Sequence, residues 1–310
     1  MLAGSVVYLT GCITISFAAQ PVGEMFTPIQ VLIRATGTLA FLLLTFILCI
    51  GPLARLSDRF KPFLYNRRHL GVTTFFIALI HAVLVLLWYH GFSDVNVIVS
   101  LFVSNPRYDS VSGFPFESLG AVALIILFVM AATSHDFWNA NLGPGVWKTL
   151  HMSVYVAFAV LIGHVVLGAL QSEKHPAYLA LVSAGAALVI GLHLLTGLGS
   201  LRPGQRAATD GWLKVAAITA FEEAKAKIVK PSVGEAIAVF KDGLEISAVS
   251  NVCRHQGGPL GEGKIVDGCI TCPWHGFQYR MRDGRSPEPY TEKIATYATR
   301  IIDGVVWVHP

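Results

Sequence analysis

Long apolar runs fill the first two thirds of this sequence, and shorter alternating segments fill the last third. Before Arg202, six runs are long enough to cross a hydrocarbon core about 30 Å thick, although the first and fourth are short. They are approximately Leu2–Ala19, Ile29–Ile50, Leu70–His90, Leu119–Thr133, Leu150–Leu170 and Tyr178–Leu198. The pattern predicts an all-α membrane domain of six helices over residues 1–200.

The first run has two interpretations. Ala18-Ala19-Gln20 could act as a signal-peptidase site, but the run lacks the basic residues that begin a signal peptide. We therefore expect a retained membrane span.

The last third of the chain shows the pattern of a small β domain. Ala236–Phe240 and Ile246–Ser250 are Val- and Ile-rich segments, with turn sequences at Lys241-Asp242-Gly243 and at Asp303-Gly304. We predict a linker over residues 201–211 and an antiparallel all-β domain over residues 212–310.

Composition and charge set the orientation. The chain is 54% hydrophobic and only 14% charged, with a net charge of +4. Five basic residues lie in Gly51–Arg68, whereas Arg107 and Lys174 are the few on the opposite side. Because Lys and Arg concentrate in cytoplasmic loops, this segment and everything beyond Gly199 are placed in the cytoplasm. The basic inner loops explain much of the net charge, so no nucleic-acid partner is implied.

Two short motifs in the β domain point to iron. Cys253-Arg254-His255 is followed by Cys272-Pro273-Trp274-His275, each in a loop that contains Gly. A Rieske [2Fe–2S] centre needs two thiolates on one iron and two imidazoles on the other. A zinc knuckle also uses Cys and His, but its usual spacings differ from Cys-x-His. The pattern favours the Rieske centre.

The stretch from Cys253 to Tyr279 resembles the Rieske ferredoxin family. The resemblance assigns Cys253 and Cys272 to one iron, and His255 and His275 to the other. Gly258 and Trp274 stand where the cytochrome bc type has a disulfide, and Phe277 stands where it has a Ser that donates to the cluster. These departures imply a low potential within the Rieske range and a reducing compartment. Cys269 is expected to be a packed strand residue.

Histidines inside the apolar runs are the second candidate site, because such residues usually face a partner or a cofactor. His151 and His164 are thirteen residues apart, about 20 Å along a helix, which suits two haems stacked across a membrane. Depth along the runs pairs His81 with His164 near the outer side and His69 with His151 near the inner side. A straight helix would place His151 and His164 about 140° apart, so we expect a tilt or a bulge near Gly163.

Other histidines leave the inner ligand set open. His69 follows Arg67-Arg68 and could be an interfacial residue, and His135 is a rival ligand. His90, His175 and His193 are expected to be interfacial or packing residues.

The membrane part resembles the ferric-reductase-like transmembrane family from about Thr27 to Gly199. Within that family it is similar to the haem-binding membrane subunit of the bacterial periplasmic methionine sulfoxide reductase system. The likeness rests on Gly51-Pro52-Leu53-Ala54-Arg55, Arg67-Arg68-His69-Leu70-Gly71 with His81, and Trp147-Lys148-Thr149-Leu150-His151 with Tyr155 and His164. It implies a six-helix haem b protein of the inner membrane, with His81, His151 and His164 at ligand positions.

These features predict an oxidoreductase component that carries electrons. The donor would be a cytoplasmic reductase or ferredoxin, and the acceptor a periplasmic protein or small molecule. The aromatic-rich loop Gly91–Glu117 could dock such a protein or rest on the lipid. A catalytic reductase of ferric chelates or oxygen, a quinone-linked oxidoreductase and a redox sensor are the alternatives. No Gly-x-Gly-x-x-Gly fingerprint or flavin motif is visible, which disfavours direct NAD(P)H oxidation.

Overall fold

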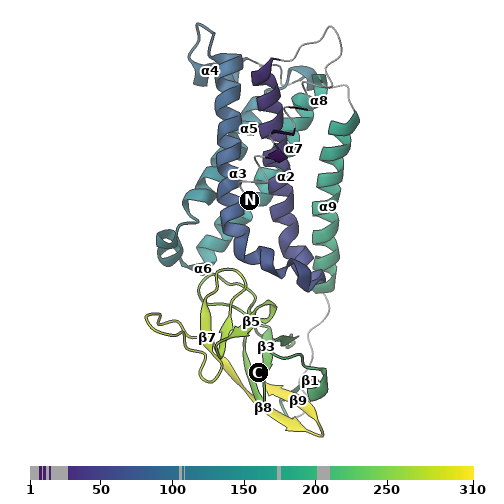
Figure 1. Ribbon diagram of the computed structural model, residues 1–310, viewed down its shortest axis with the longest axis vertical. Coiled ribbons are helices and arrows are strands. Elements are labelled where there is room, and N and C mark those ends of the chain that lie inside the picture. Colours follow the sequence, from purple (N-terminus) through teal and green to yellow (C-terminus); the bar gives the residue numbers. More distant parts are fainter. Residues whose placement is uncertain are drawn as a thin grey trace. The chain divides into compact units, whose positions relative to one another are not determined.

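A computed structural model of the 310-residue chain (Figure 1) describes residues 7, 8, 10, 11, 14, 27–104, 107, 109–172, 176–200 and 210–310. The chain forms two compact units. Unit 1 comprises Met1–Cys49, Arg68–His135 and Leu150–His193; unit 2 comprises Ile50–Arg67, Asp136–Thr149 and Leu194–Pro310. Unit 2 therefore combines two connecting segments of the helical part with the β domain.

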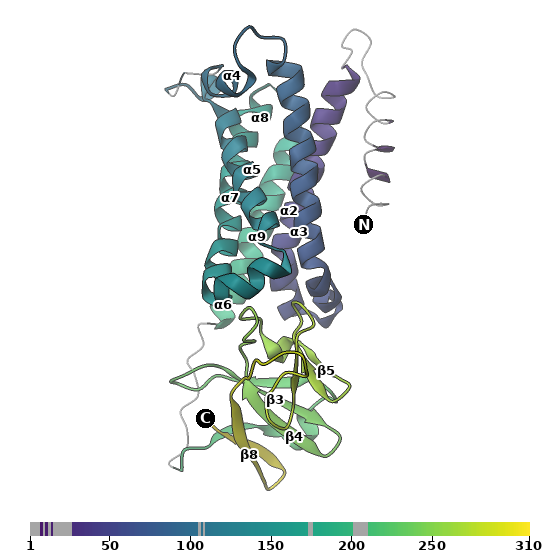
Figure 2. The same ribbon diagram turned by 90° about the vertical axis from the view of Figure 1, so that its left-hand side faces the viewer.

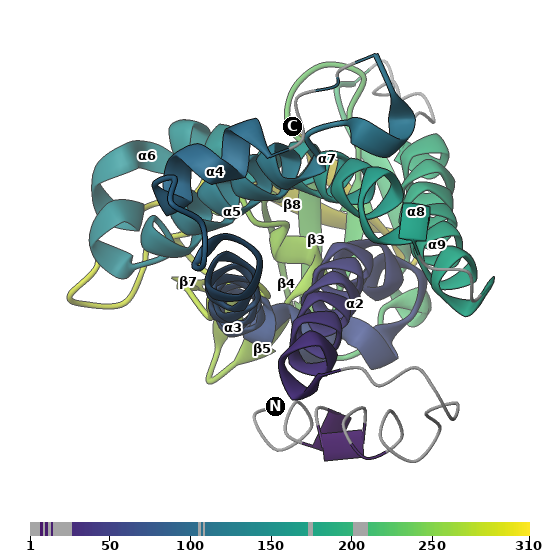
Figure 3. The same cartoon turned by 90° about the horizontal axis from the view of Figure 1, so that it is seen from above.

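The helical part is built from α2 to α9. Their bounds are α2 (Pro28–Leu56), α3 (Lys61–Val85), α4 (Val97–Val103), α5 (Phe116–Ala132), α6 (Asp136–Met152), α7 (Val154–Leu167), α8 (Ala169–Ser172) and α9 (Pro176–Ser200). A π-helical turn, Leu86–His90, extends α3. Short 3₁₀ turns lie at Asp58–Phe60 and Val111–Gly113. Seen from above (Figure 3), α5 and α7 lie side by side and pack against each other. A Cβ built at Gly120 of α5 would meet the His164 ring of α7.

Four helical segments among the described residues are long and apolar enough to cross a membrane: Pro28–Leu56, Lys61–His90, Val146–Gln171 and Pro176–Leu198. They match four of the six expected runs. Phe116–Ala132 corresponds to the short fourth run and is a shorter apolar helix. The expected first span, Leu2–Ala19, lies almost entirely outside the described residues, so the count of six spans is not established.

Burial divides the helices of unit 1 into a core and an apolar surface. Leu39, Leu44 and Leu48 of α2 are buried. In contrast, large apolar side chains are exposed on α3, α5 and α9, among them Phe76, Ile80, Ile125, Phe128, Leu188 and Ile190. A water-soluble protein rarely exposes so much apolar surface, whereas lipid solvates it. The helical part is that of a multi-pass membrane protein.

An irregularity interrupts the helix between His151 and His164. Ser153 separates α6 from α7; its amide donates to the carbonyl of Leu150 at 3.1 Å, and its hydroxyl donates to the same oxygen at 2.6 Å. We expected a tilt, or a bulge near Gly163. The structure has an irregularity at Ser153, where a side-chain hydroxyl competes for the backbone carbonyl.

The β domain contains two antiparallel sheets, and Figure 2 shows β3, β4 and β8 of the larger one. The six-stranded sheet has the order β1 (Leu213–Ala217), β9 (Val305–His309), β8 (Thr296–Ile302), β4 (Glu245–Ser250), β3 (Ile237–Asp242), β2 (Ala226–Val229). The three-stranded sheet has the order β5 (Lys264–Val266), β6 (Cys269–Thr271), β7 (Gln278–Arg280). The two segments predicted as strands correspond to β3 and β4.

Turn chemistry closes both predicted hairpins. Gly243 between β3 and β4 has a φ of +57°, and Asp303 and Gly304 between β8 and β9 have φ values of +51° and +70°. In the β8–β9 turn both central residues have positive φ, the geometry of a tight hairpin turn that follows the strand twist; in the β3–β4 turn the first central residue, Gly243, has it. Cys269 begins β6, where it pairs with Val266 and Arg280, as expected of a strand residue.

Candidate cofactor sites

Two loops of the β domain carry the predicted iron ligands. The first, with Cys253 and His255, follows β4; the second, with Cys272 and His275, joins β6 to β7. In each loop the cysteine carbonyl accepts a hydrogen bond from a glycine amide four residues later: Gly257 at 2.7 Å and Gly276 at 3.0 Å. Both glycines have a φ of +71°, which side chains rarely adopt. The two loops therefore close in the same way.

The four side chains form a thiol pair and an imidazole pair. Cys253 and Cys272 are 1% exposed and share a hydrogen bond. The His255 and His275 rings lie with centroids 5.3 Å apart, and their Nδ1 atoms are buried. Among the described residues no three His, Cys, Asp or Glu side chains form one metal-binding group. Two pairs fit a two-iron cluster with two protein ligands per iron, whereas a zinc knuckle needs four ligands around one ion.

A hydrogen bond joins the two thiols and moves their pKa values apart. The hydrogen bond with Cys272, helped by the Tyr279 hydroxyl, lowers the pKa of Cys253 to about 7. The same bond, together with burial, raises the pKa of Cys272. A thiolate is the form that binds metal, so the pocket already favours one ligand in its metal-binding state.

Tyr279 is a functional residue that the sequence pattern alone did not assign. Its hydroxyl lies 3.4 Å from the Cys253 sulfur and accepts a hydrogen bond from the Arg254 amide at 3.0 Å. Because the amide is the donor to the tyrosine oxygen, the tyrosine proton is available to the sulfur. Tyr279 is fully buried on β7 between less buried neighbours.

Aromatic packing surrounds the loops. Phe277 stacks on His255, with centroids 4.9 Å apart and planes within 8°. A Cβ at Gly258 would lie 2.8 Å from the Cys272 sulfur and 3.1 Å from the Trp274 ring. Gly258 thus leaves room for Trp274. By the resemblance, these are the two positions that a disulfide occupies in the cytochrome bc type of Rieske protein.

The outer histidine pair is brought together in unit 1. The rings of His81 on α3 and His164 on α7 have centroids 6.5 Å apart and planes at 83°. An imidazole nitrogen lies about 2 Å from a transition-metal ion that it binds. Two imidazoles on opposite sides of one iron ion would therefore have ring centroids about 6 Å apart. The spacing fits one iron between the rings.

Backbone hydrogen bonds fix the tautomers of this pair. His81 Nδ1 lies 2.9 Å from the Ile33 carbonyl oxygen, and His164 Nδ1 lies 2.8 Å from that of Phe116. A carbonyl only accepts, so each Nδ1 carries the proton, and each Nε2 is the nitrogen that can bind a metal. Metal-binding histidines are commonly oriented in this way.

Two helical glycines make room for the same rings. A Cβ at Gly37 of α2 would lie 2.9 Å from His81 Cε1, and a Cβ at Gly120 of α5 would lie 2.9 Å from His164 Cε1. Real Cβ atoms essentially never come so close to another atom. The sequence analysis did not assign these glycines, because their role depends on which helices are neighbours.

The remaining predicted inner ligands are placed separately. His69 on α3 and His135 after α5 are exposed, and His151 on α6 is half-buried with Nε2 3.4 Å from the Ser134 hydroxyl. Of the packing histidines, His90 lies 2.8 Å from Ser100 Oγ, and His193 lies 2.9 Å from the Tyr155 hydroxyl. His175 lies outside the described residues. Within the described part of the chain, the structure therefore brings His81 and His164 together as a pair, whereas it does not bring His151 together with His69 or His135 in the same way.

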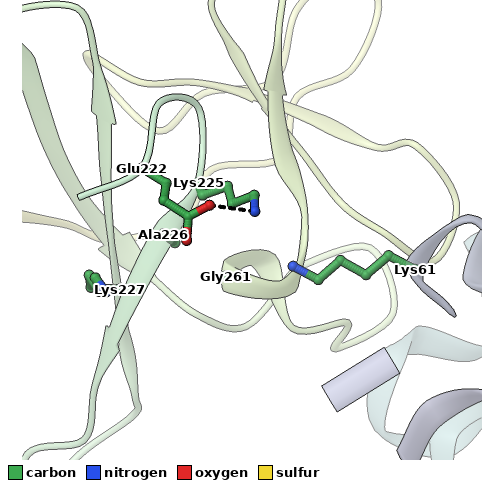
Figure 4. Close-up of a pocket in the computed structure, with 6 residues that line it drawn as sticks. All are labelled: Lys61, Glu222, Lys225, Ala226, Lys227 and Gly261. Atoms are coloured by element: carbon green, nitrogen blue, oxygen red, sulfur yellow. Dashed lines mark hydrogen bonds and ion pairs between the residues drawn. The ribbon is translucent and has the colours of Figure 1, made fainter. Parts of the chain in front are cut away.

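A polar pocket in unit 2 is separate from these ligands. It is lined by Lys61, Glu222, Lys225, Ala226, Lys227 and Gly261 (Figure 4). Lys225 donates to Glu222 at 2.6 Å across it. None of the predicted cofactor ligands lines this pocket.

Family comparisons match both parts of the chain. Residues 36–162 match the family described as "Ferric reductase like transmembrane component", and residues 211–298 match the "Rieske [2Fe-2S] domain". The chain thus joins a segment that is similar to ferric-reductase-like transmembrane components to a Rieske [2Fe–2S] domain.

Each half has named relatives. The helical half is 37% identical over 139 residues to the protein-methionine-sulfoxide reductase heme-binding subunit MsrQ of Herminiimonas arsenicoxydans, covering 44% of this chain and 58% of the relative. An MsrQ from Azospira oryzae is also 37% identical, with 52% of it covered. The chain thus spans little more than half the length of these relatives.

The β domain is 41% identical over 75 residues to the anthranilate 1,2-dioxygenase ferredoxin subunit of Burkholderia cepacia, covering 24% of this chain and 68% of that protein. A solved complex of oxygenase and ferredoxin in carbazole 1,9a-dioxygenase superimposes with a TM-score of 0.31 and 26% identity, covering 32% of this chain and 93% of that chain.

Proposed function

We propose that this protein carries single electrons across the bacterial inner membrane. Cys253, Cys272, His255 and His275 would hold a [2Fe–2S] cluster, and His81 and His164 would hold a b-type haem. When bound, both groups supply one-electron chemistry by changing iron between its ferric and ferrous states. The observation that carries the proposal is the His81–His164 pair, with rings 6.5 Å apart and both Nδ1 atoms facing carbonyls.

The protein's own side chains would tune and isolate these groups. His81 and His164 would both ligate the haem iron and leave no ligand position for oxygen, which would suit an electron carrier. The Tyr279 hydroxyl, 3.4 Å from Cys253 Sγ, would stabilise negative charge on that ligand sulfur. The protein thereby contributes placement and electrostatics to cofactor chemistry.

A second haem near the cytoplasmic side completes the proposed path. His151 would be one ligand, with His69 or His135 opposite it. Thirteen residues separate His151 from His164, about 20 Å along the chain of α6 and α7, and the break at Ser153 lies between them. We propose this inner haem on the spacing and on the family resemblance.

Charge distribution supports a direction for the path. The basic segment Gly51–Arg68 favours a cytoplasmic position for unit 2 and hence a cytoplasmic reductase or ferredoxin as donor. An acceptor on the periplasmic side, either a protein or a small molecule, would take the electrons. The MsrQ relatives are named as subunits of a protein-methionine-sulfoxide reductase, so an enzyme of that kind is one candidate acceptor. An interior-negative potential would assist outward transfer by about 2.3 kcal/mol per electron per 100 mV.

Replacement of one outer ligand tests the proposal. His164→Ala should remove the outer haem, because the iron loses one of its two imidazoles, while the cluster stays intact. Reductive titration with optical spectroscopy counts the haems, and electron paramagnetic resonance (EPR) of the same samples reports the cluster.

His193→Ala is the matched control, since His193 is a membrane-helix histidine outside the predicted ligand set, with Nε2 2.9 Å from the Tyr155 hydroxyl. Full haem content in the His164 variant would contradict the proposed ligand set. Equal loss of haem and cluster in the variant would also contradict it, because the two sites would then not be separable.

A further inference from the structure

An aromatic side chain from the helical part contacts a predicted cluster ligand. Trp147 of α6 and His275 have ring centroids 6.1 Å apart, in an edge-to-face arrangement at 84°. Both residues belong to unit 2, which joins Asp136–Thr149 and the β domain in one compact body. The His275 ring also lies beside the His255 ring, with centroids 5.3 Å apart. The imidazole is therefore packed between its fellow ligand and an indole from α6.

The same helix carries a predicted haem ligand. His151 follows Trp147 by four residues within the continuous helix α6. Residues four apart lie on the same face of a helix, about 6 Å apart along its axis. Trp147 is thus in van der Waals range of one redox ligand and one helical turn from another.

We propose that Trp147 couples the two redox sites, as the contact through which electrons pass between His275 and the side of α6 that carries His151. This inference rests on the proposed function and names a residue within its path. In each transfer one electron leaves the cluster, whose reduced iron returns to the ferric state, and one ferric haem becomes ferrous. No bond forms or breaks, and no proton is required.

The type of side chain matters for this role. Electron tunnelling weakens steeply with distance, and it is weaker across an unfilled gap than through packed atoms. An indole ring fills the space beside His275 with polarisable π density, whereas a leucine fills part of it with saturated carbon. Trp147→Leu and Trp147→Phe therefore separate an aromatic contact from simple apolar packing.

The decisive measurement is the rate of internal electron transfer. A laser flash in the presence of a flavin reduces the cluster of the full-length, cofactor-loaded protein, and the haem Soret band then reports arrival of the electron. We expect Trp147→Leu to slow the transfer by about tenfold, equivalent to about 1.4 kcal/mol in the barrier. Trp147→Phe should retain most of the wild-type rate. EPR and haem spectra should be unchanged in both variants.

Trp138→Leu is the matched control, because Trp138 lies on the same helix and packs against Phe137. It should transfer at the wild-type rate. An unaltered rate in Trp147→Leu, or equal slowing in the Leu and Phe variants, would overturn the inference. If the wild-type haem is never reduced by the cluster, the proposed function itself fails, which is a different result.

A chemical footprint tests the contact without electron transfer. Diethyl pyrocarbonate modifies accessible imidazole nitrogens, and mass spectrometry locates them. With Trp147 in place, His275 should react several-fold more slowly than it does in Trp147→Ala, and exposed His309 provides an internal reference. Equal reactivity of His275 in the two proteins would overturn the contact.

Discussion

At the scale of single residues, one hydrogen bond decides what each ligand atom can do. His81 and His164 each direct Nδ1 at a carbonyl oxygen, which leaves Nε2 for a metal. The Tyr279 hydroxyl oxygen accepts a hydrogen bond from the Arg254 amide, so its own proton can be donated to the Cys253 sulfur. These bonds cross from one element to another, so the sequence motifs could predict the ligands but not the groups that orient them.

Tyr279→Phe should lower the midpoint potential of the cluster by about 20–60 mV. The reduced cluster is more negative, so loss of one donor worth about 0.5–1.5 kcal/mol destabilises it more than the oxidised form. Redox titration followed by EPR measures the shift. Tyr297→Phe, on β8, is the control. An unchanged or raised potential would show that the Tyr279 hydroxyl does not donate to the cluster sulfur.

At the scale of elements, glycines determine how closely helices approach the histidine rings. Gly37 on α2 faces His81, and Gly120 on α5 faces His164, each with no room for a Cβ. Apolar periodicity predicted the helices, but it could not tell which faces meet. For the same reason a tilt, or a bulge near Gly163, was expected, whereas the structure has an irregularity at Ser153.

Gly120→Val should reduce outer-haem content by more than half while the helices still form. A Cβ at Gly120 would lie 2.9 Å from two atoms of the His164 ring, so the ring must leave the position in which it pairs with His81. Gly191→Val on α9 is the matched control, because nothing lies within 4 Å of a Cβ built there. The haem absorbance per mole of purified protein is the measurement. Equal haem content in the two variants would contradict the predicted crowding.

At the scale of the whole molecule, local sequence patterns predicted a helical domain and a β domain. They could not predict which side chains of different elements contact one another. Strands such as Ala236–Phe240 and the hairpin at Asp303-Gly304 were predictable because alternation and positive-φ turn residues act locally. The Trp147–His275 contact was not, because the two residues are far apart in the sequence and no spacing relates them. The pairing of His81 with His164 was predicted from depth along the runs, and their rings do meet.

An ion pair also joins a connecting segment to the β domain within unit 2. Arg55 Nε donates to Glu262 Oε1 at 3.2 Å, with side-chain exposures of 54% and 16%. Burial raises the pKa of Glu262, and the Arg55 charge opposes the shift. A carboxyl whose pKa is raised on folding contributes stability below its unfolded pKa of about 4.3 and loses that contribution as pH rises through the folded value. At neutral pH the Glu262 charge is therefore a cost that Arg55 partly offsets.

Arg55→Gln should therefore destabilise unit 2 at pH 7, and by no more than about 1 kcal/mol because solvent screens the exposed guanidinium. Glu262→Gln should cost little or nothing, since it removes the buried charge, and adding Arg55→Gln to it should have no further effect. The Arg55 effect should also vanish near pH 4, where Glu262 is protonated in both proteins. Thermal unfolding, followed by loss of cluster absorbance at the two pH values, measures all four variants of this double-mutant cycle. An Arg55→Gln effect of the same size in the Glu262→Gln background would show that Arg55 acts through some other group.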